Sequence, residues 1–104
     1  MSVFGTTRLN QIYNFLKRIP QLDLNFIART ELPEQALIAK FLPRNCTVLE
    51  LGGESGTTAI VIDKILRDPT QHIVVDPAMA AIKKMVGMRA LTHSHFKTVR
   101  GFLG

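Results

Sequence analysis

Cysteine and tryptophan are scarce in this sequence, since its 104 residues contain one cysteine, Cys46, and no tryptophan. A single cysteine excludes an intramolecular disulfide. Because Cys46 opens an apolar stretch, we interpret it as a small buried thiol rather than a nucleophile or a metal ligand.

Long apolar runs are also missing. No run approaches the ~18 residues that a membrane-spanning helix needs, and the first ten residues lack the basic and apolar regions of a secretion signal. Hydrophobic residues make up 46% of the chain and charged residues 20%, which is typical of a folded globular protein. We therefore expect a cytoplasmic protein that consists of one small domain and has no membrane segment.

Acidic residues are absent from the last part of the chain. No Asp or Glu follows Asp76, although this part carries the whole excess behind the net charge of +5. Its cations are Lys83, Lys84, Arg89, Lys97 and Arg100. Such residues can contact RNA phosphates or the acidic surface of a larger assembly. Few aromatic residues are interleaved with them, so we interpret them mainly as a solvated face and keep RNA as an alternative partner.

Two helices are predicted in the N-terminal part, residues 1–44. Apolar residues recur at helical spacing over residues 8–19, and the pattern stops at Pro20. Residues 33–42 begin with a proline suited to a first helical turn and end before Pro43. The signals between these two segments are mixed, and we predict a loop there.

Strands and helices alternate in residues 45–104. The predicted strands are residues 47–51, 72–76 and 96–102, and the predicted helices between them are residues 57–67 and 78–91. Strand–helix–strand alternation is typical of a parallel sheet with right-handed crossovers. We therefore predict an α/β fold, namely a Rossmann-like three-layer α/β/α arrangement with a partial parallel sheet of about three strands, preceded by the two N-terminal helices.

A glycine turn follows the first predicted strand, in the segment "CTVLELGGESGTT" (residues 46–58). Ligands of parallel α/β sheets sit at this position. Gly52, Gly53 and Gly56 allow positive φ and a close approach of a ligand to the backbone, and the helix from Thr57 directs unpaired amides towards it. A tight turn without any ligand would use the same residues.

The spacing of these glycines excludes two common phosphate-binding motifs. A dinucleotide fingerprint would need glycine at positions 54 and 57, or at positions 55 and 58, and none of these is glycine. A phosphate-binding loop would need a Gly-Lys pair, which does not follow. Glu50 and Glu54 flank the turn, and their carboxylates would repel a pyrophosphate. The ligand should therefore carry positive charge near the turn.

Two segments resemble known motifs of one enzyme family. "VLELGGESGTT" resembles the first motif of class I S-adenosylmethionine-dependent methyltransferases, an acid-x-Gly-x-x-x-Gly pattern after strand one. "HIVVDPAMAAIKKM" resembles their second-strand motif, which ends in an acid. The segment before the first motif is similar to that of the FkbM-type group, and the resemblance covers about residues 31–103. Many members have glycine where this chain has Glu54.

The resemblance implies an S-adenosylmethionine site built on both motifs. Glu50 and the glycine backbone would surround the methionine part of the cofactor, and Asp76 would accept hydrogen bonds from both ribose hydroxyls. A carboxylate at the end of strand two can indeed bind a vicinal diol, and it can also cap the helix that Pro77 begins. The expected cofactor-binding residues are Glu50, Gly52, Gly53, Ser55, Gly56, Thr57, Asp76 and Pro77.

By this resemblance, we expect the acceptor half of such an enzyme to be missing from this sequence. A complete fold of the family has seven strands, and we expect about three here, so the chain would be a truncated or incomplete domain. Its catalytic residues and its methyl acceptor stay unassigned. We expect completion by a missing C-terminal half or by self-association. The alternative is a non-catalytic RNA-binding or scaffolding module that reuses the half fold.

No metal site is expected. His93 and His95 could face one side of a strand, but they have no nearby third ligand. We interpret them as surface or loop histidines.

Overall fold

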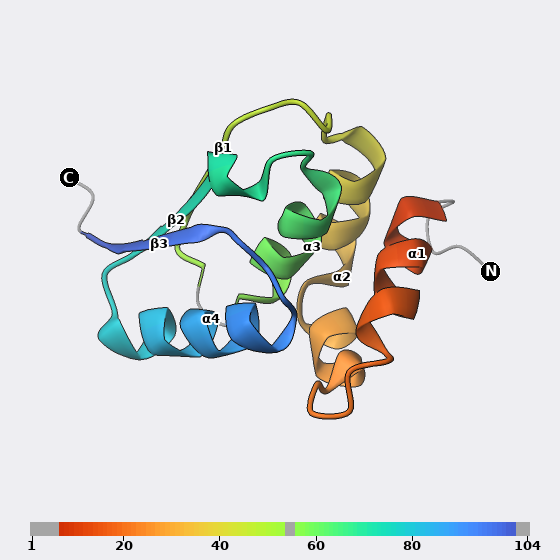
Figure 1. Cartoon of the computed structure of the whole chain (residues 1–104), viewed down its shortest axis with the longest axis horizontal. Coiled ribbons are helices and arrows are strands. Elements are labelled where there is room, and N and C mark those ends of the chain that lie inside the picture. Colours follow the sequence, from red (N-terminus) through yellow and green to blue (C-terminus); the bar gives the residue numbers. More distant parts are fainter. Residues whose placement is uncertain (1–6, 54–55, 102–104) are drawn as a thin grey trace.

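The computed structural model of the chain describes residues 7–53 and 56–101, without the side chains of residues 24 and 26–30. The order of its elements, shown in Figure 1, confirms the predicted α/β class. The elements are α1 (Thr7–Leu16), α2 (Leu24–Phe41), β1 (Val48–Leu51), α3 (Thr57–Ile65), the 3-10 helix η2 (Pro69–Gln71), β2 (His72–Asp76), α4 (Met79–Leu91) and β3 (Lys97–Arg100).

The three strands form a parallel sheet in the order β1-β2-β3. One crossover contains α3 and the other contains α4 (Figure 1). The register places Leu51 beside Val75 and Asp76 beside Arg100. The carboxyl ends of β1 and β2, where the two predicted motifs lie, are therefore neighbours.

Both crossover helices cover the same face of this sheet. Ala59 of α3, Val74 of β2, Met85 of α4 and Phe96 before β3 form one buried cluster. The short apolar run of β2 is explained by this position, because the central strand is covered on its Val74 face and flanked on both sides. We call this side of the sheet the covered face.

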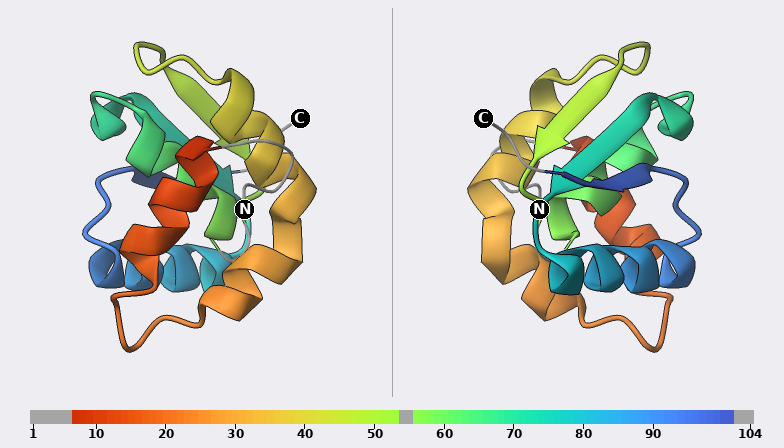
Figure 2. Two further views of the ribbon diagram at one scale, coloured as in Figure 1. Left: turned by 90° about the vertical axis from the view of Figure 1, so that its right-hand side faces the viewer. Right: turned by 90° about the vertical axis from the view of Figure 1, so that its left-hand side faces the viewer.

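The opposite side of the sheet, which we call the open face, carries the alternate residues of each strand. Leu49 is 63% exposed, Leu51 is 54% exposed and Val99 is 47% exposed, and they lie beside Ile73 and Val75 of β2. In the right-hand view of Figure 2 the strands lie in front of α1 and α3. The crossover helices of the described part of the chain cover one face of the sheet, and the helix layer that the predicted α/β/α arrangement needs on the open face is not seen in it.

The two N-terminal helices pack on α3 rather than on the sheet (Figures 1 and 2). Their shared core contains Leu9, Ile12, Leu16, Ala36, Ala39, Ile60, Val61 and Ile65. Helix α3 therefore lies between the sheet and these helices, which explains why its sequence is apolar on nearly all sides. No helix within the described residues is long and apolar enough to cross a membrane.

The predicted loop before residue 33 is wrong, because α2 already begins at Leu24. The helix is kinked at Glu31, where φ is −141° and ψ is 36°. Pro33 lies two residues later, and a proline inside a helix lacks the amide needed for the ladder and clashes with the preceding turn. The sequence pattern therefore predicts the second half of α2 but not the first half.

Candidate functional site

The glycine turn is attached to the end of the neighbouring strand. Gly52 has φ +79° and donates its amide to the carbonyl of Val75 at 2.7 Å. Gly56 has φ +82° and donates its amide to the carbonyl of Gly53 at 2.9 Å. Because side chains disfavour these φ values, glycine is required at both ends of the turn.

Gly53 is needed for a different reason, which is the space around it. A Cβ atom at this position would lie 2.3 Å from Cγ1 of Val74 and 2.6 Å from Sδ of Met85. A Cβ atom at Gly56 would lie 3.2 Å from Cγ of Met85. The turn therefore packs tightly against β2 and α4, and this packing was not foreseen from the sequence.

The first turn of α3 presents two threonines next to the glycine turn. The hydroxyl of Thr57 donates to Oε1 of Glu31 at 2.9 Å, which joins α3 to the kink of α2. Thr58 is 7% exposed, and its hydroxyl has no hydrogen-bond partner among the described residues. Buried hydroxyls are nearly always paired, so Thr58 is a candidate ligand contact that our sequence reasoning missed.

Asp76 ends β2 and is almost completely buried, with 5% of its surface exposed. Its carboxylate accepts the amide of Ala78 at 2.9 Å, and its carbonyl accepts the amide of Gly101 at 3.2 Å. Helix α4 begins at Met79, one residue after the predicted start at residue 78. The predicted capping role of Asp76 is wrong, because Ala78 is the N-cap of α4 and no side chain caps it. The bond from Asp76 to the Ala78 amide orders the turn before the helix instead, one strand away from the glycine turn.

Glu50 has an internal partner on the covered face. Its Oε1 lies 3.1 Å from Nε2 of His72, whose ring is fully buried and stands 5.6 Å from the ring of Phe96. The side chain of Glu50 remains 17% exposed. Our sequence reasoning did not foresee this pair, which holds the Glu50 carboxylate under the sheet near the carboxyl end of β1.

The expected cofactor residues are thus only partly brought together. Gly52, Gly53, Gly56 and Asp76 meet at the carboxyl ends of β1 and β2. Thr57 turns towards α2, and Pro77 is exposed. Ser55 and Glu54 lie outside the described residues.

The basic residues of the C-terminal part do not share one surface. Lys83 and Lys84 are exposed on α4, whereas the register places Lys97 on the open face. Arg89 donates to the carbonyl of Phe96 at 3.0 Å and lies over its ring. Arg100 donates to the carbonyl of Pro77 at 3.0 Å. Two of the five guanidinium or ammonium groups are therefore already engaged within the fold.

The remaining candidates from the sequence are His93, His95 and Cys46. His93 and His95 are exposed, and no group of three or more metal-ligating side chains occurs in the part of the chain that the structure covers. Cys46 is half-buried instead of buried, and its thiol donates to the carbonyl of Pro43 at 3.2 Å.

Comparisons of the sequence with protein-family models and with curated proteins found no match, and neither did a comparison of the fold with solved structures. The function must therefore be argued from the residues and their geometry.

Proposed function

We propose that this chain binds S-adenosylmethionine at the glycine turn and forms the cofactor-binding portion of a class I methyltransferase. The observation that carries the proposal is the bond between the Gly52 amide and the Val75 carbonyl. It holds the glycine backbone beside the strand that ends in Asp76. In parallel α/β sheets this is where nucleosides bind, with an acid on the ribose hydroxyls.

The charges of the described residues favour a cationic ligand at this turn. Glu50 is the last residue but one of β1, with its carboxylate beside His72, and Asp76 ends β2. Both carboxylates would attract the ammonium and sulfonium groups of S-adenosylmethionine and repel a pyrophosphate. This preference agrees with the spacing of the glycines, which fits neither phosphate-binding motif.

The hydroxyl of Thr58 supports the same proposal. It is buried at the start of α3, directly after the glycine turn, and has no partner among residues 7–53 and 56–101. A polar ligand group at the turn would supply the missing hydrogen bond.

The cofactor supplies the methyl group, and the protein's task is to hold it in line with an acceptor nucleophile. The turn would hold the amino-acid part against its glycine backbone, and Asp76 would fix the ribose. No acceptor site or general base is assigned to this chain, so the proposal covers binding and orientation only.

Calorimetric titration with S-adenosylmethionine tests the role of Asp76 through two substitutions. Asp76→Ala removes both the diol contact and the acceptor for the Ala78 amide. Asp76→Asn keeps an oxygen for that amide but removes the negative charge. We expect both variants to raise the Kd about tenfold or more, since charge-assisted hydrogen bonds to the diol are lost.

Asp68→Asn is the matched control, because Asp68 is exposed and caps η2 before the opposite end of β2. It should bind the cofactor as the wild type does. An unchanged Kd for Asp76→Asn, in a variant that circular dichroism shows to be folded, would contradict the proposed site.

The alternative function is a non-catalytic RNA-binding or scaffolding module. The exposed pair Lys83 and Lys84 on α4 favours it most. It requires RNA affinity that falls steeply with salt and falls again in a Lys83→Gln, Lys84→Gln variant. Titration of RNA and S-adenosylmethionine in parallel separates the two functions.

A further inference from the structure

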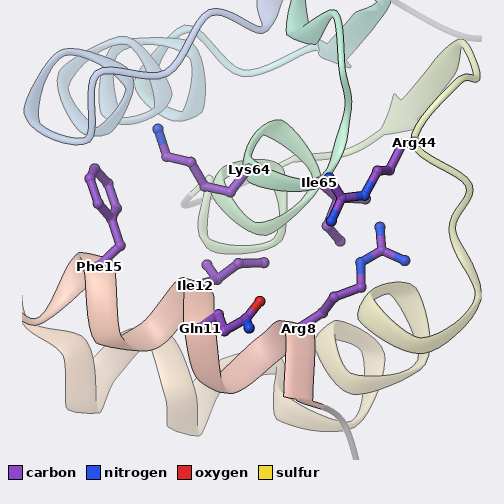
Figure 3. A pocket seen from close by; sticks show the side chains of 7 residues that line it. All are labelled: Arg8, Gln11, Ile12, Phe15, Arg44, Lys64 and Ile65. Carbon is purple, nitrogen blue, oxygen red and sulfur yellow. The ribbon is translucent and has the colours of Figure 1, made fainter.

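A pocket remote from the glycine turn lies between α1, the C-terminal end of α3 and the segment that precedes β1 (Figure 3). Its volume is about 410 Å³. Its lining residues are Arg8, Gln11, Ile12, Phe15, Arg44, Lys64 and Ile65. Three of these residues carry positive charge, and none of them is acidic.

Arg8 is the least satisfied group of this pocket. Its Nη2 atom is buried and has no hydrogen-bond partner among the described residues. A guanidinium keeps its charge at any physiological pH, so it cannot escape this position by losing a proton. A buried cationic donor without a partner is costly, which indicates that a missing acceptor belongs beside it.

Arg44 faces the same end of the pocket. In Figure 3 the Arg8 and Arg44 side chains approach each other from α1 and from the segment before β1. The backbone of Arg44 is fixed, because its carbonyl accepts the amide of Arg67 at 2.9 Å. Two guanidinium groups repel each other unless an anion lies between them. Arginine pairs of this kind favour phosphate, which they can bind through parallel hydrogen bonds.

The other end of the pocket is lined by Ile12, Phe15 and Lys64. Figure 3 shows Ile12 between the two arginines and the ring of Phe15. Lys64 belongs to this end, since its ammonium already donates to the carbonyl of Thr92 at 2.6 Å and lies 5.1 Å from the Phe15 ring centroid. The pocket therefore combines a charged end with an apolar wall.

We propose that this pocket binds a small organic phosphate, with its phosphate group between Arg8 and Arg44 and its apolar part against Ile12 and Phe15. The proposal does not depend on the glycine turn, which lies beyond the opposite end of α3. It assigns the chain a second ligand site of the opposite charge preference.

Amide NMR titration with phenyl phosphate tests this site, with inorganic phosphate, phenol and benzoate as separate probes. We expect saturable shifts at Gln11, Ile12 and Phe15 with phenyl phosphate. Inorganic phosphate and phenol should each bind more weakly, because each makes only one half of the contacts. Benzoate of equal or higher affinity would overturn the assignment of phosphate.

Arg8→Gln and Arg44→Gln should each weaken phenyl phosphate binding about tenfold or more. Arg18→Gln makes the same charge change at an exposed position outside the lining and should leave the affinity unchanged. Since Arg44 is exposed, its variant stays informative even where Arg8→Gln fails to fold. Equal affinity for the wild type and Arg44→Gln, or equal losses in Arg18→Gln and Arg44→Gln, would overturn the proposal.

Discussion

At the scale of single residues, the turn needs glycine for two different reasons. Gly52 and Gly56 supply positive φ, whereas Gly53 supplies empty space beside Val74 and Met85. These demands hold with or without a ligand, so the glycines alone do not reveal a function. The proposed ligand rests on what surrounds them, namely the Asp76 carboxylate and the Thr58 hydroxyl, which has no partner among the described residues.

Gly53→Ala should destabilise the fold strongly. Its Cβ would overlap Cγ1 of Val74 and Sδ of Met85, at 2.3 and 2.6 Å. Overpacking of this kind costs about 1–3 kcal/mol, or more where the backbone cannot move. Urea unfolding measures the loss.

Gly87→Ala is the matched control, because Gly87 lies within α4 and its Cβ would meet open space. Alanine is the better helix former, so this variant should gain about 0.5–1 kcal/mol. Equal stability of the two variants would show that the turn does not pack as described.

At the scale of elements, a half-buried hydrogen bond joins α1 to α2. The hydroxyl of Tyr13 donates to Oε1 of Gln35, which is fully buried. Burial raises the pKa of Tyr13 from 10.0 to about 12. The phenol therefore stays neutral in the folded protein at a pH where it ionises in the unfolded chain.

The stability of the protein should fall as the pH rises through the window from 10 to about 12 that the pKa of Tyr13 defines. In this window the unfolded chain has released the phenolic proton and the folded protein has kept it, so rising pH favours unfolding. Below pH 10 the contribution is fully present. Tyr13→Phe cannot ionise and should lose less stability across the window.

Urea unfolding of the wild type and Tyr13→Phe, at about pH 9 and about pH 11, isolates this contribution from that of the lysines. At the lower pH the variant should be less stable by about 0.5–1.5 kcal/mol, because one hydrogen bond is lost. A parallel decline of both proteins with pH would show that the Tyr13 phenol is not buried.

Most elements could be predicted from the sequence, because the spacing of apolar residues and the prolines at helix ends are local signals. Strand β2 has the predicted bounds, and α4 and β1 begin within two residues of theirs. The first half of α2 was missed, because the kink at Glu31 and the proline at position 33 interrupt the helical pattern of the sequence. The role of Asp63 could not be predicted from its place in an apolar helix. Its carboxylate accepts hydrogen bonds from the amides of His95 and Phe96 at 2.7 and 3.0 Å, which fixes the start of β3.

The candidate site was predictable only in part, for the same reason. The motif spacing indicated Gly52 and Asp76, and the parallel register brings their strands together. Glu50 and its partner His72 are 22 positions apart in the sequence. Arg8 and Arg44, which line the same pocket, are 36 positions apart. No local pattern in a single sequence records such contacts.

At the scale of the whole molecule, the open face is the most unusual feature. Leu49, Leu51 and Val99 expose much of their surface on one side of the sheet, and β1 and β3 are its edges. Contiguous apolar patches and unpaired strand edges are typical of surfaces that associate. In doubly wound sheets a further strand lies beside the first one, at the edge that β1 occupies here.

We therefore expect copies of this chain to associate through the open face. Replacing Leu49 and Leu51 by lysine should shift the protein towards the monomer in sedimentation experiments, because it removes the apolar surface at an edge strand. The matched control replaces Leu37 and Phe41, which are 59% and 68% exposed on α2, by lysine. It makes the same charge change and should still associate. A wild type that stays monomeric at high concentration would contradict the expectation.

We propose that the glycine turn selects a cationic nucleoside over a pyrophosphate. Amide NMR titration with S-adenosylmethionine, and in parallel with NAD, tests it most directly. We predict saturable shifts at Gly52, Gly53 and Gly56 with S-adenosylmethionine and none with NAD. Saturable shifts at these three amides with NAD, or none with S-adenosylmethionine, would contradict it.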